Sequence, residues 1–166
     1  MILKGTVWKF GDDISTDLIA PGRYFHLRSN LPEMAKHVME DADPTFASKV
    51  QEGDFLVAGK NFGLGSSREH APIIIKLAGV SAVLAKSFAR IFYRNSINVG
   101  LPVLICDTDQ IQTEDELEID LEKGTVTNHI KNLKLTFAPL PKVMINILND
   151  GGLVAHIQKH KDFKLS

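Results

Sequence analysis

Short apolar runs alternate with amphipathic segments through the first two thirds of the chain. Residues 54–59, 80–86 and 101–106 are predicted to be buried strands, because each run is short and almost wholly apolar. Apolar positions at helical spacing lie between them, over 69–77 and 87–100. This strand–helix–strand–helix–strand order predicts parallel pairing with right-handed crossovers.

Two shorter helices are expected earlier in the chain, over 31–41 and 43–50. Polar residues next to the apolar positions suggest where the helices begin. Asp43 is the expected cap of the helix at 43–50, and Ser87 is the expected cap of the helix at 87–100.

The N-terminal part combines a strand with a long irregular segment. Residues 2–10 are predicted to be a strand, since β-branched and aromatic side chains recur along them. Residues 11–30 are rich in Gly, Asp, Ser, Thr and Pro and show no clear period. A loop of this length is uncommon in a compact domain and tends to be functional.

The C-terminal third changes pattern. Residues 115–130 and 133–137 alternate between apolar and polar, which predicts antiparallel strands around a turn at Gly124. Residues 141–160 are expected to form one or two helices, broken at Gly151–Gly152. The fold class is therefore α/β, with a partly parallel sheet flanked by helices and an antiparallel C-terminal addition.

Length and composition fit a single compact domain over residues 1–166, with 44% hydrophobic and 23% charged residues. The net charge of −1 means that basic residues are not in excess, so we expect no nucleic-acid partner. No leader pattern and no membrane-length apolar run is present, so a cytoplasmic location without a membrane partner is expected. The only cysteine, Cys106, ends an apolar run and is expected to be buried.

The segment GLGSSREH, residues 63–70, lies between an expected strand and an expected helix. This position brings free backbone N–H groups of the helix start near Ser66, Ser67 and Arg68, which suits an anionic ligand. The segment lacks the lysine of a Walker loop and the further glycine of a dinucleotide or hydrolase motif. Either a small carboxylate or phosphate binds here, or the serines only cap the helix and Arg68 pairs with an acid.

Two other groups of charged residues have more than one interpretation. Arg90 and Arg94 share a helical face, so they could clamp a dicarboxylate or form an ion-paired surface. Asp12, Asp13 and Asp17 match no calcium loop, and turn and cap roles explain them better.

The histidines are scattered, and no pair has a convincing zinc spacing, so no metal ligands are expected in this chain. They are His26, His37, His70, His129, His156 and His160.

Three blocks in series carry a family resemblance. GDDISTDLIAP at 11–21, GKNFGLGSSREHAP at 59–72 and AKSFARIFYRNSINVGLP at 85–102 resemble the small subunits of 3-isopropylmalate dehydratases. That family is similar to the swivelling fourth domain of aconitases. The resemblance covers about residues 11–102 and continues loosely into the C-terminal helices, and it implies a single swivelling β/β/α domain.

The resemblance also implies an activity. The family is a hydro-lyase of leucine biosynthesis, which interconverts 2-isopropylmalate and 3-isopropylmalate through 2-isopropylmaleate. A separate large subunit carries a [4Fe–4S] cluster that acts as Lewis acid. We therefore expect that large subunit as partner, a small 2-hydroxy dicarboxylic acid as substrate, and no cofactor bound by this chain. Its one cysteine agrees, because such clusters need several thiolates.

Residue roles carry over from the matching motif. Ser66 matches the catalytic serine, which would remove the carbon-bound proton as an alkoxide. Ser67 and Arg68 match residues that contact the substrate carboxylate. No family role is carried onto Arg90 or Arg94.

Relatives read the variable substituent of the substrate with a short loop, which matches Tyr24–Leu27 here. Phe25 and Leu27 suit an isopropyl group. His26 stands where isopropylmalate enzymes tend to have an apolar residue and homoaconitate enzymes tend to have arginine. Arg28 lies two positions later and could compensate. The alternatives are a related dehydratase of homoaconitate, methylmalate or dimethylmalate, and a non-catalytic anion- or RNA-binding module.

Overall fold

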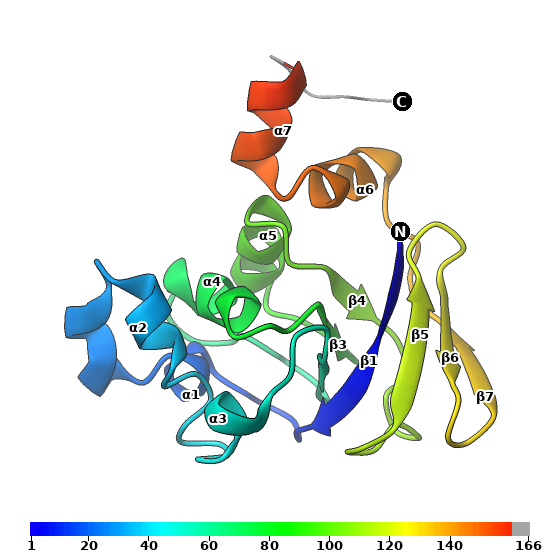
Figure 1. Ribbon diagram of the computed structural model, residues 1–166, viewed down its shortest axis with the longest axis horizontal. Coiled ribbons are helices and arrows are strands. Elements are labelled where there is room, and N and C mark those ends of the chain that lie inside the picture. The colour runs from blue at the N-terminus through cyan, green and yellow to red at the C-terminus, as the bar shows by residue number, and fades with distance from the viewer. Residues whose placement is uncertain (161–166) are drawn as a thin grey trace.

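The computed structural model describes residues 1–160 and contains one seven-stranded mixed sheet with helices packed against it (Figure 1). The strands are β1 (Ile2–Lys9), β2 (Phe55–Val57), β3 (Ala82–Ala85), β4 (Val103–Ile105), β5 (Glu116–Asp120), β6 (Thr125–Asn128) and β7 (Leu133–Thr136). The helices are α1 (Thr16–Ile19), the 3-10 helix η1 (Gly22–Leu27), α2 (Leu31–Ala35), α3 (Phe46–Lys49), α4 (His70–Leu77), α5 (Arg90–Asn98), α6 (Lys142–Asn149) and α7 (Leu153–His160). The strand order is β4-β3-β2-β1-β5-β6-β7.

One half of the sheet is parallel, as the sequence predicted. β1, β2, β3 and β4 pair in parallel. Successive side chains point to opposite faces, so Leu56 and Val83 join the core beneath the helices, while Phe55, Val57 and Leu84 join a second core on the other face. Burial on both faces explains why β2, β3 and β4 are continuous apolar runs.

The other half is antiparallel, which confirms the second expectation. β5 pairs with β1, β6 with β5, and β7 with β6. Leu117, Ile119 and Val126 point into the second core, and the alternate positions between them are polar. The turn between β5 and β6 includes Gly124, whose φ of +70° favours glycine.

The described part of the chain ends in two helices, separated at Gly151–Gly152 as predicted. Gly152 has a φ of +130°, and a Cβ there would lie 2.7 Å from the carbonyl oxygen of Asn98. Glycine is therefore needed where the chain turns from α6 into α7. In Figure 1, α7 stands away from the body of the molecule.

Two regions near the start of the chain differ from the prediction. Residues 11–30 are not a plain loop, because Ser15 caps α1 by accepting a hydrogen bond from the N–H of Leu18 at 3.1 Å. α2 ends at Ala35 rather than near residue 41. Beyond it the N–H of Met39 leaves the helical pattern and donates to the Ile19 carbonyl oxygen at 3.0 Å, which draws the buried Met39 into the core.

Both expected caps were wrong. Asp43 accepts from the N–H of Thr45 at 2.9 Å, and Thr45, not Asp43, holds the cap position of α3. Ala89 holds the cap position of α5. Ser87 instead accepts a hydrogen bond from the N–H of Asn61 at 2.9 Å. This bond links the glycine-rich segment between β2 and α4 to the residues just before α5.

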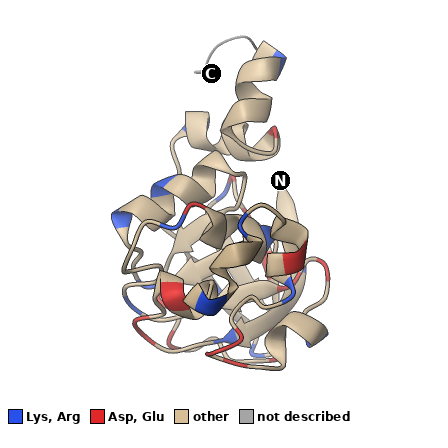
Figure 2. Ribbon diagram, turned by 90° about the vertical axis from the view of Figure 1, so that its left-hand side faces the viewer, with Lys and Arg blue, Asp and Glu red and all other residues tan. Residues whose placement is uncertain are grey.

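No helix within residues 1–160 is long and apolar enough to cross a membrane. On the face shown in Figure 2, acidic and basic residues are interspersed and form no single basic patch. Cys106 is buried, as expected.

Candidate active site

The glycine-rich segment between β2 and α4 forms the floor of a pocket of about 370 Å³. Gly63 has a φ of +84°, and a Cβ there would lie 2.2 Å from the ring of Phe92. Gly65 has a φ of +104°. The first glycine therefore allows α5 to pack against the segment, and both allow its tight turn.

Hydrogen bonds join this segment to the start of the long irregular region. The N–H of Gly63 donates to the Ile14 carbonyl oxygen at 2.7 Å, and the N–H of Thr16 donates to the Leu64 carbonyl oxygen at 2.8 Å. The hydroxyl of Thr16 donates to the Ser66 carbonyl oxygen at 2.8 Å. These bonds fix the backbone that carries Ser66.

Arg68 is held by three oxygen atoms. Its Nε donates to the hydroxyl oxygen of Ser66 at 3.1 Å. Its Nη1 lies 3.1 Å from Oδ1 of Asp17 and also donates to the carbonyl oxygen of Ala20. A cationic donor on the Ser66 oxygen favours an alkoxide over the neutral hydroxyl.

The expected helix start lies elsewhere. α4 begins at His70, with Glu69 at its cap position, so Ser66 and Ser67 do not cap it. The N–H of Arg68 is not free either, because it donates to the Ser66 carbonyl oxygen at 2.9 Å. The positive character of the site therefore comes mainly from the Arg68 guanidinium rather than from the helix terminus.

His70 follows the site directly. Burial, and then the nearby charge of Arg68, lower the pKa of His70 below its usual value. At neutral pH this imidazole is neutral, so it adds no positive charge. Its ring lies 5.9 Å from the ring of Phe25, measured between centroids.

The pocket brings together residues from three parts of the chain. Ser66, Ser67 and Arg68, all predicted as site residues, line it. Arg90 also lines the pocket, which is compatible with the dicarboxylate-binding alternative that the sequence left open for it. Thr16 and Asn95 line the pocket too, and sequence reasoning singled out neither of them. The spacing of Arg90 and Arg94 was the available signal, but Arg94 lines a separate groove between α5 and α6.

The four residues predicted to read the substituent lie on η1 and do not line this pocket. Tyr24 is directed away, because its hydroxyl donates to Glu40 and its ring stacks on His37 at 3.9 Å between centroids. Phe25 is 47% exposed, His26 is exposed, and Leu27 packs against the core under the helices.

Asp17 connects η1 to the pocket. The same Oδ1 that pairs with Arg68 accepts a hydrogen bond from the N–H of Gly22, the first residue of η1, at 3.1 Å. The position of η1 is therefore coupled to that of the Arg68 guanidinium. Asp12 accepts from the N–H of Lys60 at 2.7 Å. Lys60 lies 48 positions further along the chain, so Asp12 joins two segments rather than closing a local turn.

The sequence of this chain is similar to those of several known proteins. A family model described as the aconitase C-terminal domain matches residues 16–108. A relative from Archaeoglobus fulgidus, named 3-isopropylmalate dehydratase small subunit 2, is 67% identical over 99% of this chain and 100% of its own length. Another, from Methanothermobacter thermautotrophicus and named methanogen homoaconitase small subunit, is 52% identical over 99% of this chain and 96% of its own length.

A solved structure shares the fold. The crystal structure of 3-isopropylmalate dehydratase from Methanocaldococcus jannaschii has a TM-score of 0.92 and 51% sequence identity, and the match covers 97% of this chain and 96% of that one. The chain therefore belongs to the aconitase C-terminal domain family, among the small subunits of 3-isopropylmalate dehydratases.

Proposed function

We propose that this chain is the small subunit of a hydro-lyase that interconverts 2-isopropylmalate and 3-isopropylmalate through 2-isopropylmaleate, in leucine biosynthesis. The observation that carries the proposal is the hydrogen bond from the Arg68 guanidinium to the hydroxyl oxygen of Ser66, at the floor of a pocket. A serine is a weak base in water, and it needs such a donor to act as one.

In the proposed reaction, Ser66 exchanges one proton with the substrate. An acid of the proposed large subunit protonates the C2 hydroxyl of 2-isopropylmalate, which leaves as water, while the Ser66 alkoxide takes the proton from C3 and the C2–C3 double bond of 2-isopropylmaleate forms. Water then adds with the opposite placement: its hydroxyl goes to C3, its remaining proton returns to that acid, and Ser66 returns the proton to C2. Arg68 and Ser67 bind a substrate carboxylate, and Arg90 offers a second cation at the rim.

The residues of this chain do not fit an iron–sulfur cluster. Such clusters are held by several thiolates, and the sequence has only Cys106. Burial raises the pKa of that thiol to about 11, so it is protonated at neutral pH. We propose that a large subunit carries the cluster, that this chain closes on it as one swivelling unit, and that the pair works in the cytoplasm.

Homoaconitate is the second candidate substrate, and one observation supports it specifically. One relative is named a homoaconitase small subunit, and His26 is neither clearly apolar nor a permanent cation. The alternative of another class, an RNA-binding module, has little support, because the net charge is −1 and acidic and basic positions are interspersed along the ribbon in Figure 2.

The test is a Ser66→Ala variant, assayed with a large subunit whose cluster is intact, under exclusion of oxygen. We expect kcat for 2-isopropylmalate to fall on the order of 10² to 10⁴. The thermal midpoint should hardly change, since Ser66 caps no helix. Ser48→Ala is the matched control, because Ser48 is an exposed serine on α3. Normal kcat in Ser66→Ala with normal assembly contradicts the proposal.

A further inference from the structure

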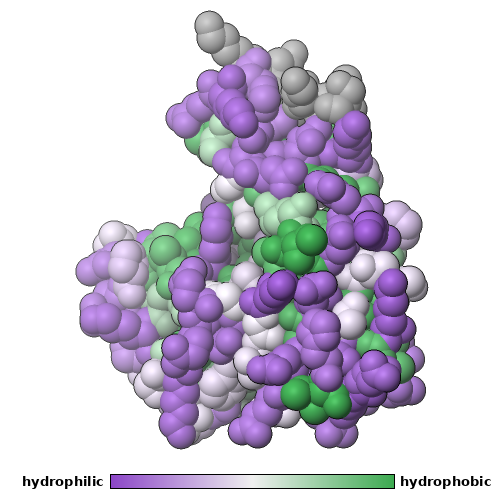
Figure 3. All heavy atoms as spheres, turned by 45° about the vertical axis from the view of Figure 1, so that its right-hand side comes forward, coloured by the Kyte–Doolittle hydropathy of each residue, from purple (hydrophilic) through white to green (hydrophobic). Residues whose placement is uncertain are grey.

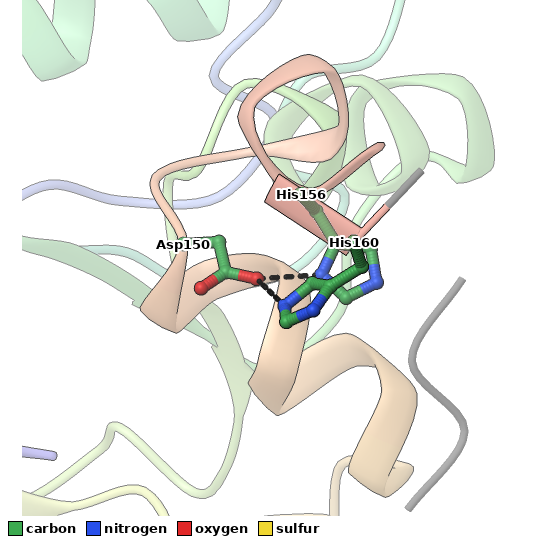
Figure 4. A group of neighbouring side chains, drawn as sticks. All are labelled: Asp150, His156 and His160. Atoms are coloured by element: carbon green, nitrogen blue, oxygen red, sulfur yellow. Dashed lines mark hydrogen bonds and ion pairs between the residues drawn. The ribbon is translucent and has the colours of Figure 1, made fainter. Parts of the chain in front are cut away.

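Two histidines and a carboxylate meet where α7 folds back toward α6. Asp150 is the residue directly after α6, and Gly151 and Gly152 turn the chain with φ values of +90° and +130°. His156 and His160 are four residues apart on α7, so they share one face of the helix. Figure 4 shows both rings directed at the Asp150 carboxylate.

The three side chains place their ligand atoms close together. Oδ2 of Asp150 lies 2.7 Å from Nδ1 of His156 and 3.0 Å from Nε2 of His160. All three ligand atoms lie within 4.8 Å of one another. Tetrahedral zinc with bonds of about 2.1 Å needs ligand atoms roughly 3.4 Å apart, so small side-chain movements convert this cluster into a metal site.

The carboxylate is suited to bind a cation. One of its oxygen atoms, Oδ2, faces the ring nitrogens of both histidines. Lys159 takes the other oxygen, with its Nζ 3.1 Å from Oδ1, and leaves Oδ2 facing the histidines. The Lys159 side chain is 66% exposed, so solvent screens its repulsion of a bound cation.

Space for the remaining coordination positions lies beside the cluster. An open hollow of about 230 Å³ is bordered by Asn146, Asn149, Asp150, Lys159 and His160. Its lining is polar, so water molecules can complete the shell of a metal held by three protein ligands.

α7 has few apolar anchors to the rest of the protein. His156 is its only fully buried residue, whereas Val154 and Ile157 are 68% and 40% exposed. The part of the molecule that projects at the top of Figure 3 is mostly hydrophilic on the face shown. Because few apolar contacts hold α7, the contacts within this cluster contribute more to keeping α7 in position than a surface ion pair usually does.

We propose that Asp150, His156 and His160 form a zinc-binding site that fastens α7 to the end of α6. Two imidazoles and one carboxylate are a ligand set that suits zinc. The site lies outside the Ser66 pocket and shares no lining residue with it. The proposal is independent of the proposed function.

The first test uses the full chain without a histidine tag, stripped with a chelator and titrated with Zn²⁺ alone. We expect one zinc per chain by elemental analysis and calorimetry, with a higher thermal midpoint. His160→Gln should weaken binding on the order of 100-fold and abolish the thermal shift. His129→Gln is the control, because His129 is also a histidine near a carboxylate, with Nε2 3.9 Å from Glu118. Equal zinc affinity of His160→Gln and the unaltered chain overturns the proposal.

A second measurement does not depend on the folding of a variant. In spectra of the unaltered chain with ¹⁵N-labelled histidine, Zn²⁺ should shift the resonances of Nδ1 of His156 and Nε2 of His160, and leave His129 unchanged. The proposal is overturned if only other histidines shift, or if nothing shifts at one equivalent of zinc. The three side chains then only form hydrogen bonds with one another.

Discussion

The guanidinium of Arg68 is positioned before any substrate arrives. Asp17, Ala20 and Ser66 each supply an oxygen atom to it. Fixed donors of this kind stabilise developing negative charge without the cost of reorienting water. At the scale of single residues, the geometry of Arg68 therefore matters as much as its charge.

Arg68→Lys tests that statement, because lysine keeps the charge and loses the planar fork. We expect kcat of the reconstituted enzyme to fall on the order of 10², with KM also raised through weaker carboxylate binding. Steady-state kinetics separate the two parameters. Arg94→Lys serves as control, since Arg94 does not line the Ser66 pocket. Unchanged kcat in Arg68→Lys shows that charge alone suffices.

His26→Arg tests the proposed reading of the substrate substituent by η1. A buried carboxylate without a cationic partner is costly, and arginine supplies a permanent, planar cation for it. We expect the native pair to prefer 2-isopropylmalate at pH 8, and the variant to shift kcat/KM toward homoaconitate by at least about tenfold.

The control for the substrate test is His129→Arg, which adds the same charge to an exposed position on the C-terminal side. A native preference for homoaconitate at pH 8 contradicts the substrate assignment and makes Arg28 the next residue to replace. If the ratio of kcat/KM for homoaconitate to that for 2-isopropylmalate is the same in His26→Arg and in the native pair, η1 does not take part in substrate recognition.

At the scale of elements, one buried carboxylate joins neighbouring segments of the antiparallel half of the sheet. Asp115, directly before β5, is 4% exposed. It accepts from the N–H of Gln112 and from Nδ2 of Asn128, both at 2.8 Å, while Nζ of Lys131 lies 3.4 Å away. Burial alone raises the pKa of Asp115, but these contacts outweigh burial and hold it below its usual value.

This lowered pKa predicts how stability depends on pH. Because the folded-state pKa lies below the unfolded value of about 3.9, the ionised carboxylate stabilises the fold above that value, and the contribution is lost as pH falls through the folded pKa. Asp115→Asn should therefore lower the free energy of unfolding at pH 7, and its difference from the unaltered chain should shrink below about pH 4.

Denaturant unfolding at pH 7, 5 and 3 measures the Asp115 effect. Glu52→Gln is the control, because Glu52 is exposed. A difference between Asp115→Asn and the unaltered chain that stays constant from pH 7 to pH 3 shows that the ionised form of Asp115 has no special role.

At the scale of the whole molecule, this chain contributes only one side of the proposed active site. The Ser66 pocket is open and holds the proposed base and the carboxylate-binding cation. The thiolates that a cluster requires are absent from the sequence, apart from the buried Cys106. Catalysis by the chain alone is therefore not expected.

The isolated chain should be colourless and show no turnover of 2-isopropylmalate. Addition of a large subunit with an intact cluster, under exclusion of oxygen, should restore activity, and the Ser66→Ala chain should assemble without restoring it. Visible absorption and a coupled assay measure both properties. Turnover by the purified small subunit alone contradicts the division of the site between two chains.

Local signals in the sequence were sufficient for the strands, for most helices and for three residues that line the pocket. Apolar runs identified β2, β3 and β4, because strands buried on both faces need apolar side chains at every position. Glycines marked the turns of the chain at Gly124 and Gly151–Gly152, because those turns need positive φ values. The motif at 63–70 identified Ser66, Ser67 and Arg68, and the family match supports that resemblance.

Helix starts depended on contacts that the sequence does not display. Ser87 has the composition of a cap, but its hydroxyl oxygen accepts a hydrogen bond from Asn61, a residue of a different segment. The same reason explains α2, which ends early because the N–H of Met39 pairs with Ile19. A capping residue has several possible donors, and only the packed chain decides which one it meets.

The sequence by itself determined the fold class, the family and which residues the glycine-rich segment contributes to the pocket, since each depends on residues close together in the chain. Only the tertiary structure placed Arg90 beside Ser66 and brought Asp150 to His156 and His160. Spacing along one helix predicts which histidines share a face. The third ligand, Asp150, comes from the end of another helix. The turn at Gly151–Gly152 decides how far Asp150 lies from the two histidines.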